Sequence, residues 1–236
     1  MKNRASNWID YWNRETIWQD ILKKTVDIFV SATEKLLTYN NQDIILDIGC
    51  GPGYLETLLK DRVKKIYCLD TSERYLDICR KKFERDQNIF IYRLDKDNYT
   101  DLSFLKNEKF SIIICLSVIQ YYNSITDVKK LIKEVQRVAL PGAKFLIADI
   151  PTKTGMFSDI CDTLLTGLRE RYLMKTIKFL FRAIISEYHK VRPSFGLLNL
   201  SIEDLKKLTD ELDLEAEILS MRMSININRK HLLIKF

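Results

Sequence analysis

The sequence predicts an α/β fold in which a doubly wound, mostly parallel sheet carries helices on both faces. Short apolar segments typical of buried strands alternate with amphipathic helical segments from residue 43 to residue 150. A glycine-rich turn at residues 49–53 joins the first of these strands to a helix. The chain has 236 residues, of which 46% are hydrophobic and 30% charged, so it is long enough to bury one large core.

The glycine-rich turn indicates that a ligand approaches the backbone at the end of the first strand. Residues 44–48 form an apolar strand, residues 49–53 contain three glycines, and residues 54–59 read as a helix. Glycine permits the positive φ angles and the close contact that such a turn needs. The spacing is G-x-G-x-G, whereas dinucleotide enzymes use G-x-G-x-x-G. Asp47, two residues before the first glycine, is a poor neighbour for a pyrophosphate, so the pattern favours a ligand with a positive centre.

The second and third strands each end in an acidic residue. The strand over 66–69 leads to Asp70, which lies 19 residues beyond Gly51. This interval is close to the roughly 20 residues of one βαβ step. The strand over 89–92 leads to Asp95, and Asp97 follows two residues later; the alternative for either acid is a solvated position in a loop.

The fourth and fifth strands continue the alternation. The fourth covers 110–116 and is followed by a helix over about 127–139. Pro and Gly at 141–142 predict a turn before a fifth strand at 143–150. The carboxyl ends of parallel strands lie at one edge of the sheet, so ligand-binding residues are expected there.

The two ends of the chain differ from this alternating core. Residues 6–38 have apolar positions at helical spacing, and residues 157–190 read as helical without strand signals. Ser201 is a helix cap, with Asp204 as its partner three residues later. Two final strands are expected over 214–223 and 225–236.

Residues 46–53, Leu-Asp-Ile-Gly-Cys-Gly-Pro-Gly, resemble the first motif of the class I S-adenosylmethionine (SAM)-dependent methyltransferases of the small-molecule type. Asp70 and Asp95 are in register with two later acids of that family. The resemblance implies a Rossmann-like, seven-stranded sheet with an antiparallel last strand, an N-terminal helix and a helical lid insertion. The expected division is an N-terminal helical cap (1–42), a SAM-binding core (43–150), a helical lid (151–195) and a C-terminal part of the core sheet (196–236).

The resemblance also implies how SAM would be held. Asp47 and the backbone of the glycine turn would hold its methionine part, and Asp70 its ribose. Thr71 and Tyr75 would flank the adenine, and Asp95 would accept from its amino group. Alternatives are a NAD enzyme or a glycine turn that binds nothing. The expected cofactor-binding residues are Tyr11, Asp47, Gly49, Cys50, Gly51, Gly53, Asp70, Thr71, Tyr75, Leu94, Asp95, Leu116 and Ser117.

The N-terminal aromatic residues have two interpretations. Trp8, Tyr11, Trp12 and Trp18 either cap the cofactor or pack against the core or the lid.

A hydroxyl acceptor needs a base to remove its proton, and His189 and Asp149 are the candidates. For His189 the alternative is a surface histidine at a helix end, and for Asp149 a side chain pointing out of the sheet. His231, in the last strand, is expected to lie far from the site. Gln120 and Tyr121, after the fourth strand, are expected to contact substrate together with Arg192; no metal is expected.

The insertion over 151–195 carries eight basic and four acidic residues, whereas the whole chain has a net charge of +6. Three interpretations remain open: a solvated basic helix face, attraction of an anionic metabolite, and docking on an anionic membrane surface. Its apolar stripe would line the lid or a dimer interface, so the oligomeric state is left open.

The predicted activity is transfer of a methyl group from SAM to a hydroxyl, or to an amine, of a small metabolite, with anionic metabolites among the candidates. The alternatives are a membrane-borne quinone or lipid as acceptor, and a non-catalytic SAM-binding regulator. A nucleic acid partner is disfavoured, because Leu116-Ser117-Val118-Ile119 stands where base-amino methyltransferases carry Asn/Asp-Pro-Pro-Tyr/Phe. Five scattered cysteines without a C-x-x-C pair, no signal peptide and no spanning helix favour a cytoplasmic protein.

Overall fold

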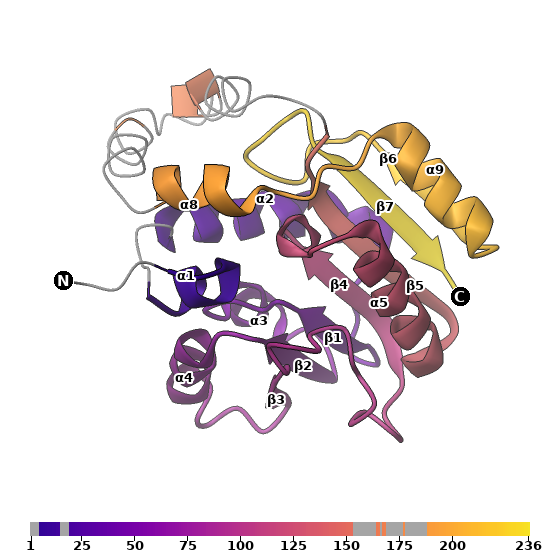
Figure 1. Ribbon diagram of the computed structural model, residues 1–236. Helices are drawn as coiled ribbons and strands as arrows, with labels where there is room; N and C mark the ends of the chain where they lie inside the picture. The colour runs from indigo at the N-terminus through magenta and orange to yellow at the C-terminus, as the bar shows by residue number, and fades with distance from the viewer. Residues whose placement is uncertain (1–4, 15–18, 153–163, 166, 169–176, 178–187) are drawn as a thin grey trace.

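A computed structural model describes the chain except for residues 1–4, 15–18, 153–163, 166, 169–176 and 178–187 (Figure 1). Its centre is one seven-stranded sheet with the order β3-β2-β1-β4-β5-β7-β6. β7 runs antiparallel to both β5 and β6, whereas the other neighbours are parallel. The strands are β1 (Ile44–Ile48), β2 (Lys65–Asp70), β3 (Ile89–Arg93), β4 (Phe110–Leu116), β5 (Ala139–Ile150), β6 (Glu215–Leu219) and β7 (Lys230–Lys235).

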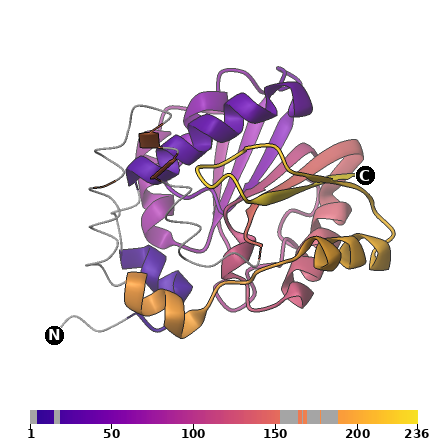
Figure 2. The same cartoon turned by 90° about the horizontal axis from the view of Figure 1, so that it is seen from above.

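Helices cover both faces of the sheet, because strand residues alternate between two apolar cores (Figure 2). Ile45 faces the core built with α2, α3 and α4, whereas Leu46 and Ile48 face the core built with α5 and α9. The predicted α/β doubly wound fold is therefore confirmed. The helical elements are α1 (Trp8–Arg14), α2 (Gln19–Leu37), α3 (Tyr54–Leu59), α4 (Glu73–Lys82), the 3-10 turn η1 (Ile119–Tyr121), α5 (Ile125–Val138), α8 (Tyr188–Phe195) and α9 (Ile202–Glu211).

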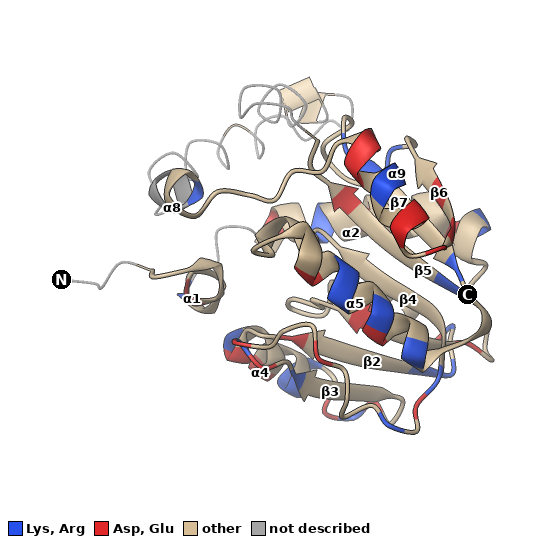
Figure 3. Ribbon diagram, turned by 45° about the vertical axis from the view of Figure 1, so that its right-hand side comes forward, with Lys and Arg blue, Asp and Glu red and all other residues tan. Residues whose placement is uncertain are grey.

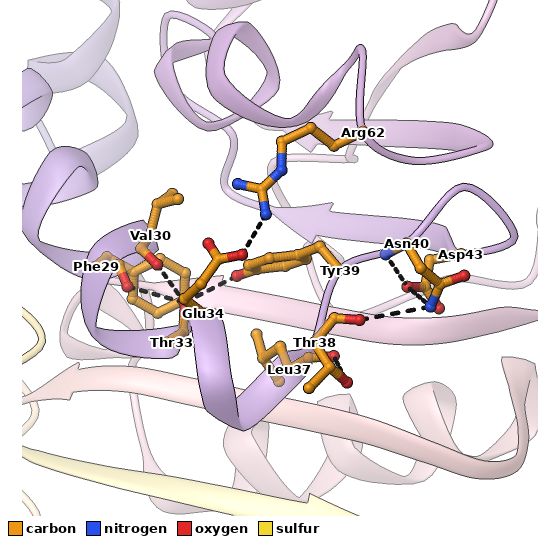
Figure 4. A network of polar contacts seen from close by, with 10 residues as sticks. All are labelled: Phe29, Val30, Thr33, Glu34, Leu37, Thr38, Tyr39, Asn40, Asp43 and Arg62. Carbon is orange, nitrogen blue, oxygen red and sulfur yellow. Dashed lines mark hydrogen bonds and ion pairs between the residues drawn. The ribbon is translucent and has the colours of Figure 1, made fainter.

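The junction between α2 and β1 is fixed by polar contacts (Figure 4). Thr33 Oγ1 lies 2.9 Å from the Tyr39 hydroxyl, and burial raises the pKa of that hydroxyl. Asn40 donates from its backbone N–H (2.8 Å) and its side chain (2.7 Å) to one carboxylate oxygen of Asp43. These contacts fix the end of α2 next to the start of β1, and β1 leads directly into the glycine turn.

The outer faces of α5 and α9 carry both signs of charge, as Figure 3 shows. An ion pair between Lys129 and Glu211 joins the two helices. The predicted capping box at the start of α9 is present, since Ser201 accepts from the backbone of Asp204 and Asp204 accepts from that of Ser201.

Several boundaries differ from the sequence-based prediction. β5 begins at Ala139, because the expected turn at 141–142 continues the strand through a register irregularity, with Gly142 at φ +80°. β6 and β7 are shorter than expected, and residues 220–229 connect them. The expected 6–38 helix contains α1 and α2, with 15–18 outside the described residues.

Most of the expected lid also lies outside the described residues. Of 151–195, the structure describes 151–152, 164–165, 167–168, 177 and α8, in which side chains are described only from residue 192 onward. Within the described ranges, no helix is both long and apolar enough to cross a membrane.

Candidate active site

The carboxyl ends of β1, β2, β4 and β5 lie at one edge of the sheet, as parallel pairing requires. The glycine turn follows β1, Asp70 ends β2, Ser117 follows β4 and Asp149 lies near the end of β5. This edge therefore brings together residues that are up to 102 positions apart in the chain (Asp47 to Asp149).

The glycine turn packs against the end of β4 on one side and is open on another. Gly49 has φ +80°, and a Cβ there would lie 2.2 Å from Val118 Cγ2. Gly51 has φ +56°, and the place of its Cβ has no other atom within 4 Å. The Gly49 N–H donates to the Leu69 carbonyl at 2.7 Å, which ties the turn to β2. The space that a side chain would fill at Gly51 is consequently open to close approach of a ligand.

Asp70 is oriented by two backbone donors. One carboxylate oxygen accepts from the Gly51 N–H at 2.9 Å, and the other from the Ser72 N–H at 2.8 Å. Burial raises the pKa of Asp70, and these backbone hydrogen bonds oppose that rise. Each carboxylate oxygen keeps a second lone pair, so the group can still accept from two ligand hydroxyls.

Asp47 lies beneath the turn rather than beside the ligand space. Its side chain faces α3, where Glu56 is fully buried, and Asp47 itself is 3% exposed. Burial raises the pKa of Asp47 well above its usual range, and the neighbouring Glu56 carboxyl raises it further. Burial also raises the pKa of Glu56. Two like charges so close in a buried site favour a shared proton over double ionisation.

A first cavity lies over the glycine turn and Asp70, with α1 on its other side. Its volume of about 160 Å³ is smaller than the roughly 300–1,000 Å³ usual for small-molecule sites. It is lined by Trp8, Ile9, Trp12, Leu22, Ile48, Gly49, Gly51, Asp70, Thr71, Tyr75, Leu94, Tyr99, Leu116, Ser117, Val118, Tyr121 and Tyr122.

Aromatic rings of α1 cover this cavity. The Tyr121 ring lies 4.9 Å from the Trp8 ring and 5.5 Å from the Trp12 ring, centroid to centroid. The Trp8 indole N–H donates to the Gly196 carbonyl at 2.9 Å, which joins α1 to the end of α8. Trp8 and Trp12 line the cavity, whereas Tyr11 is 1% exposed and packs behind them.

A second cavity of about 770 Å³ adjoins the first and shares several aromatic residues with it. It lies between α1, η1 and the chain that follows α8. Its lining combines aromatic rings with side-chain amides: Asn7, Trp8, Ile9, Lys96, Asp97, Tyr99, Gln120, Tyr121, Tyr122, Asn123, Phe195, Gly196, Leu197, Leu198 and Asn199.

Many of the residues expected to bind cofactor or substrate line these cavities. Gln120 lines the second, and Tyr121 lines both. Those in the first cavity are Gly49, Gly51, Asp70, Thr71, Tyr75, Leu94, Leu116 and Ser117.

Other expected residues lie outside both linings. Asp95 is exposed, and its Oδ1 accepts the backbone N–H groups of Asp97 (2.7 Å) and Asn98 (3.2 Å). Cys50 is buried, and a Cβ on Gly53 would lie 2.6 Å from Phe83 Cε2, so both face the protein interior.

The two expected residues of α8 are described to different extents, and of the two only Arg192 can be compared with the cavity linings, which do not include it. Arg192 is partly buried. The backbone of His189 belongs to α8, but its side chain lies outside the described residues.

Asp149 is held by protein groups on both carboxylate oxygens. Ser117 Oγ donates to Oδ2 and Ser224 Oγ donates to Oδ1, each at 2.6 Å. Arg229 Nε lies 3.7 Å from Oδ1. The backbone N–H of Asp149 donates to His231 Nδ1 at 3.0 Å. His231 is therefore part of the support behind this edge.

Ile9, Leu22, Tyr99 and Val118 line the first cavity without having been predicted to. The apolar residues carry no signal that separates a cavity wall from a core. Tyr99 lies in the β3–β4 connection, where its hydroxyl donates to Asp127 at 2.9 Å.

Among the described residues, no cluster of three or more His, Cys, Asp or Glu side chains could hold a metal ion.

Residues 46–147 match the model of a methyltransferase domain. This match contains the glycine turn, Asp70 and Ser117, which form the site. Over residues 46–147 the chain is a class I SAM-dependent methyltransferase domain. The sheet order β3-β2-β1-β4-β5-β7-β6 with antiparallel β7 agrees with that assignment.

Two curated relatives are O-methyltransferases. The malonyl-[acyl-carrier protein] O-methyltransferase of Priestia megaterium is 32% identical over 102 residues, which cover 42% of this chain and 35% of the relative. The ubiquinone biosynthesis O-methyltransferase of Coxiella burnetii is 26% identical over 108 residues, covering 45% of this chain and 43% of the relative. The match thus spans less than half of either relative's length.

The fold is similar to a solved structure over nearly its whole length. Magnesium protoporphyrin IX methyltransferase from Synechocystis, with bound SAM, aligns with a TM-score of 0.57 and 16% identity. The alignment covers 98% of this chain and 92% of the other. At this identity the likeness shows the fold alone.

Proposed function

We propose that this chain binds SAM in the first cavity and transfers its methyl group to a hydroxyl, or to an amine, of a small molecule. The observation that carries the proposal is Asp70, whose carboxylate borders the cavity beside the open backbone of Gly51. A vicinal diol on a ligand would find its acceptor there, and the ligand could contact the turn at Gly51. These features fit the ribose of SAM.

The other residues have consistent parts in this proposal. Tyr75, Thr71 and Leu94 would surround the adenine, because they line the cavity next to Asp70. Asp47 would favour the positively charged methionine end from beneath the turn. Asp95 remains a candidate for the adenine amino group, and would have to turn from its present backbone partners toward the ligand.

When bound, SAM supplies a methyl group on a sulfonium that is already activated for in-line displacement. The chain would then contribute positioning and exclusion of water. Trp8, Trp12 and Tyr121 cover the first cavity, so they are placed to exclude water during transfer.

The second cavity is the proposed acceptor site. It adjoins the first at Tyr121 and Tyr122, and its volume is within the range of small-molecule sites. The side-chain amides of Gln120, Asn123 and Asn199 can donate to and accept from a hydroxyl acceptor. Rings on the same walls favour a planar group. The base remains a proposal: His189 and Asp149 are kept as candidates, with Arg192 as a substrate contact.

The sequence leaves two alternative functions open, and each can be tested by its own experiment. A membrane-borne quinone or lipid acceptor is favoured by the basic 151–195 segment, and liposomes carrying the acceptor would then raise turnover. A SAM-binding regulator would bind SAM without forming S-adenosylhomocysteine.

Cys50, Cys68, Cys79 and Cys115 are free thiols, which supports a reducing, cytoplasmic compartment.

Incubation with SAM labelled in its methyl group and a panel of hydroxylated and amine-bearing small molecules tests the activity. Labelled product together with S-adenosylhomocysteine is expected from the wild-type protein, with strong loss in Asp70→Ala and little change in Asp61→Ala, an exposed acid. SAM binding without any product across aromatic, carboxylated and lipid acceptors would favour the regulator.

A further inference from the structure

Asp149 stands at the centre of a buried polar network behind the cofactor site. Its carboxylate accepts from Ser117 on one oxygen and from Ser224 on the other, each at 2.6 Å. Asp149 is 8% exposed, Ser224 1% and His231 1%. The partners come from the segment after β4, the β6–β7 connection and β7, so Asp149 of β5 contacts three other parts of the sheet region.

The backbone at this network is held in an uncommon conformation. Asp149 has φ +64° and Ser117 has φ +59°, in the left-handed region that L side chains rarely adopt. The Ser117 N–H donates to the carbonyl of Ala148 at 3.0 Å, so the two left-handed residues lie on neighbouring strand ends. Such a conformation persists only where surrounding contacts enforce it, and it is concentrated at functional sites.

The network reaches the cofactor site through Ser117. Ser117 and Val118 line the first cavity. Val118 also packs against Gly49, since a Cβ added to Gly49 would lie 2.2 Å from Val118 Cγ2. The position of Ser117 therefore sets the position of Val118, and Val118 bounds the glycine turn. A change at Asp149 would be felt at the turn although Asp149 lines neither cavity of the described residues.

We propose that Asp149 is a positioning residue that holds the end of β4 in the shape required to bind SAM, with Ser224, Arg229 and His231 holding Asp149 in turn. This inference rests on the proposed function, because it assigns Asp149 to the same cofactor site. It differs from the role of a base, since a base must reach the acceptor, whereas both Asp149 oxygens already accept from serine hydroxyls.

The charged groups around the network fit this role. Arg229 Nε lies 3.7 Å from Asp149 Oδ1, and Arg229 is 6% exposed. His231 accepts the Asp149 N–H at Nδ1, so this nitrogen is unprotonated in the network. Burial lowers the pKa of His231, whereas the Asp149 charge and a backbone hydrogen bond with Met221 raise it and Lys230 lowers it.

Asp149→Asn is the decisive variant. It keeps the shape and tolerates the left-handed φ, but removes the charge that orders both serine hydroxyls. We expect the Kd for SAM, measured by calorimetry, to rise about tenfold, with KM for SAM rising in parallel and kcat at saturating SAM within about twofold. Asp213→Asn is the matched control, because Asp213 is also a left-handed aspartate (φ +49°) but lies between α9 and β6.

Ser224→Ala supports the test if Asp149→Asn does not fold. It removes one partner of Asp149 without touching either cavity, and a smaller rise in Kd is expected.

The outcomes separate this inference from the proposed function. If the wild-type protein does not bind SAM, the proposed function itself is overturned. A wild-type protein that binds SAM, with unchanged Kd in both Asp149→Asn and Ser224→Ala, overturns only the positioning role. Unchanged Kd with a collapsed kcat, recovered at higher pH, would instead make Asp149 the base.

Discussion

At the scale of single residues, we expect the buried Asp47–Glu56 pair to couple SAM binding to the release of a proton. Burial, and then the neighbouring Glu56 carboxyl, raise the pKa of Asp47 well above its usual range. A positively charged ligand nearby favours the ionised form, so the pKa of Asp47 should be lower in the complex than in the free protein. Binding then releases a proton, and affinity should increase with pH until the pKa of the free protein is passed.

Calorimetry in two buffers with different ionisation enthalpies measures that proton release. We expect the observed binding enthalpy to differ between the buffers for the wild-type protein. Glu56→Gln removes the like charge and lowers the pKa of Asp47, so the difference should shrink. Equal enthalpies in both buffers for the wild-type protein would contradict this account.

Gly49 is a second residue with a definite expectation. Gly49→Ala adds a methyl group 2.2 Å from Val118 Cγ2 at φ +80°, so it should reduce the free energy of unfolding by about 1–3 kcal/mol. Gly142→Ala is the matched control, because Gly142 also has φ +80° but nothing within 4 Å of the added methyl. Urea unfolding should show a larger loss for Gly49→Ala. Equal losses would mean that the contact with Val118 relaxes without cost.

At the scale of elements, α1 is the part that should move when SAM binds. The first cavity, about 160 Å³, is smaller than usual small-molecule sites, and the rings of Trp8 and Trp12 form part of its wall. SAM should therefore displace these rings and change the tryptophan fluorescence. In a Trp18→Phe background, which leaves Trp8 and Trp12 as the two tryptophans, the change should persist, and Trp12→Phe should reduce it. Emission that does not respond to saturating SAM would rule out movement of α1.

β7 should make the fold sensitive to acid. Burial lowers the pKa of His231 below its usual value of 6.5. As pH falls, His231 therefore gains its proton in the unfolded chain before it does so in the folded protein. The stability that is present above about pH 6.5 is lost as pH falls from there toward the lower pKa of His231 in the folded protein. His231→Gln should reduce the fall of Tm between pH 7 and pH 5. His189→Gln, at the other histidine of the chain, should leave that fall unchanged. An identical acid loss in wild type and His231→Gln would contradict the assignment.

At the scale of the whole molecule, the sequence predicted the parts whose signal is local. The apolar strands, the glycine turn and Asp70 follow from spacing within about thirty residues, and they lie together as expected. The network around Asp149 was not predictable, because Ser224 lies 75 positions away and serine at such a distance carries no pattern. The lengths of β6 and β7 were overestimated, since the apolar residues at 220–229 belong to a connection and not to a strand.

The second cavity shows the same limit on a larger scale. It is assembled from α1, the β3–β4 connection, η1 and the segment after α8, which periodicity cannot bring together. Asp95 followed from its register with a known motif, yet it lies in a turn with Asp97 and Asn98. Its part in binding therefore depends on a rearrangement that the sequence does not encode locally.

Calorimetric titration with SAM and, separately, with NADH tests the central claim most directly. We predict micromolar binding of SAM that weakens at least tenfold in Asp70→Ala, a loss of about 1.4 kcal/mol or more, and that is unchanged in Asp61→Ala. We predict no binding of NADH, because the G-x-G-x-G turn with Asp47 disfavours a pyrophosphate. Binding of NADH in place of SAM, or SAM affinity that is indifferent to Asp70→Ala, would contradict the account.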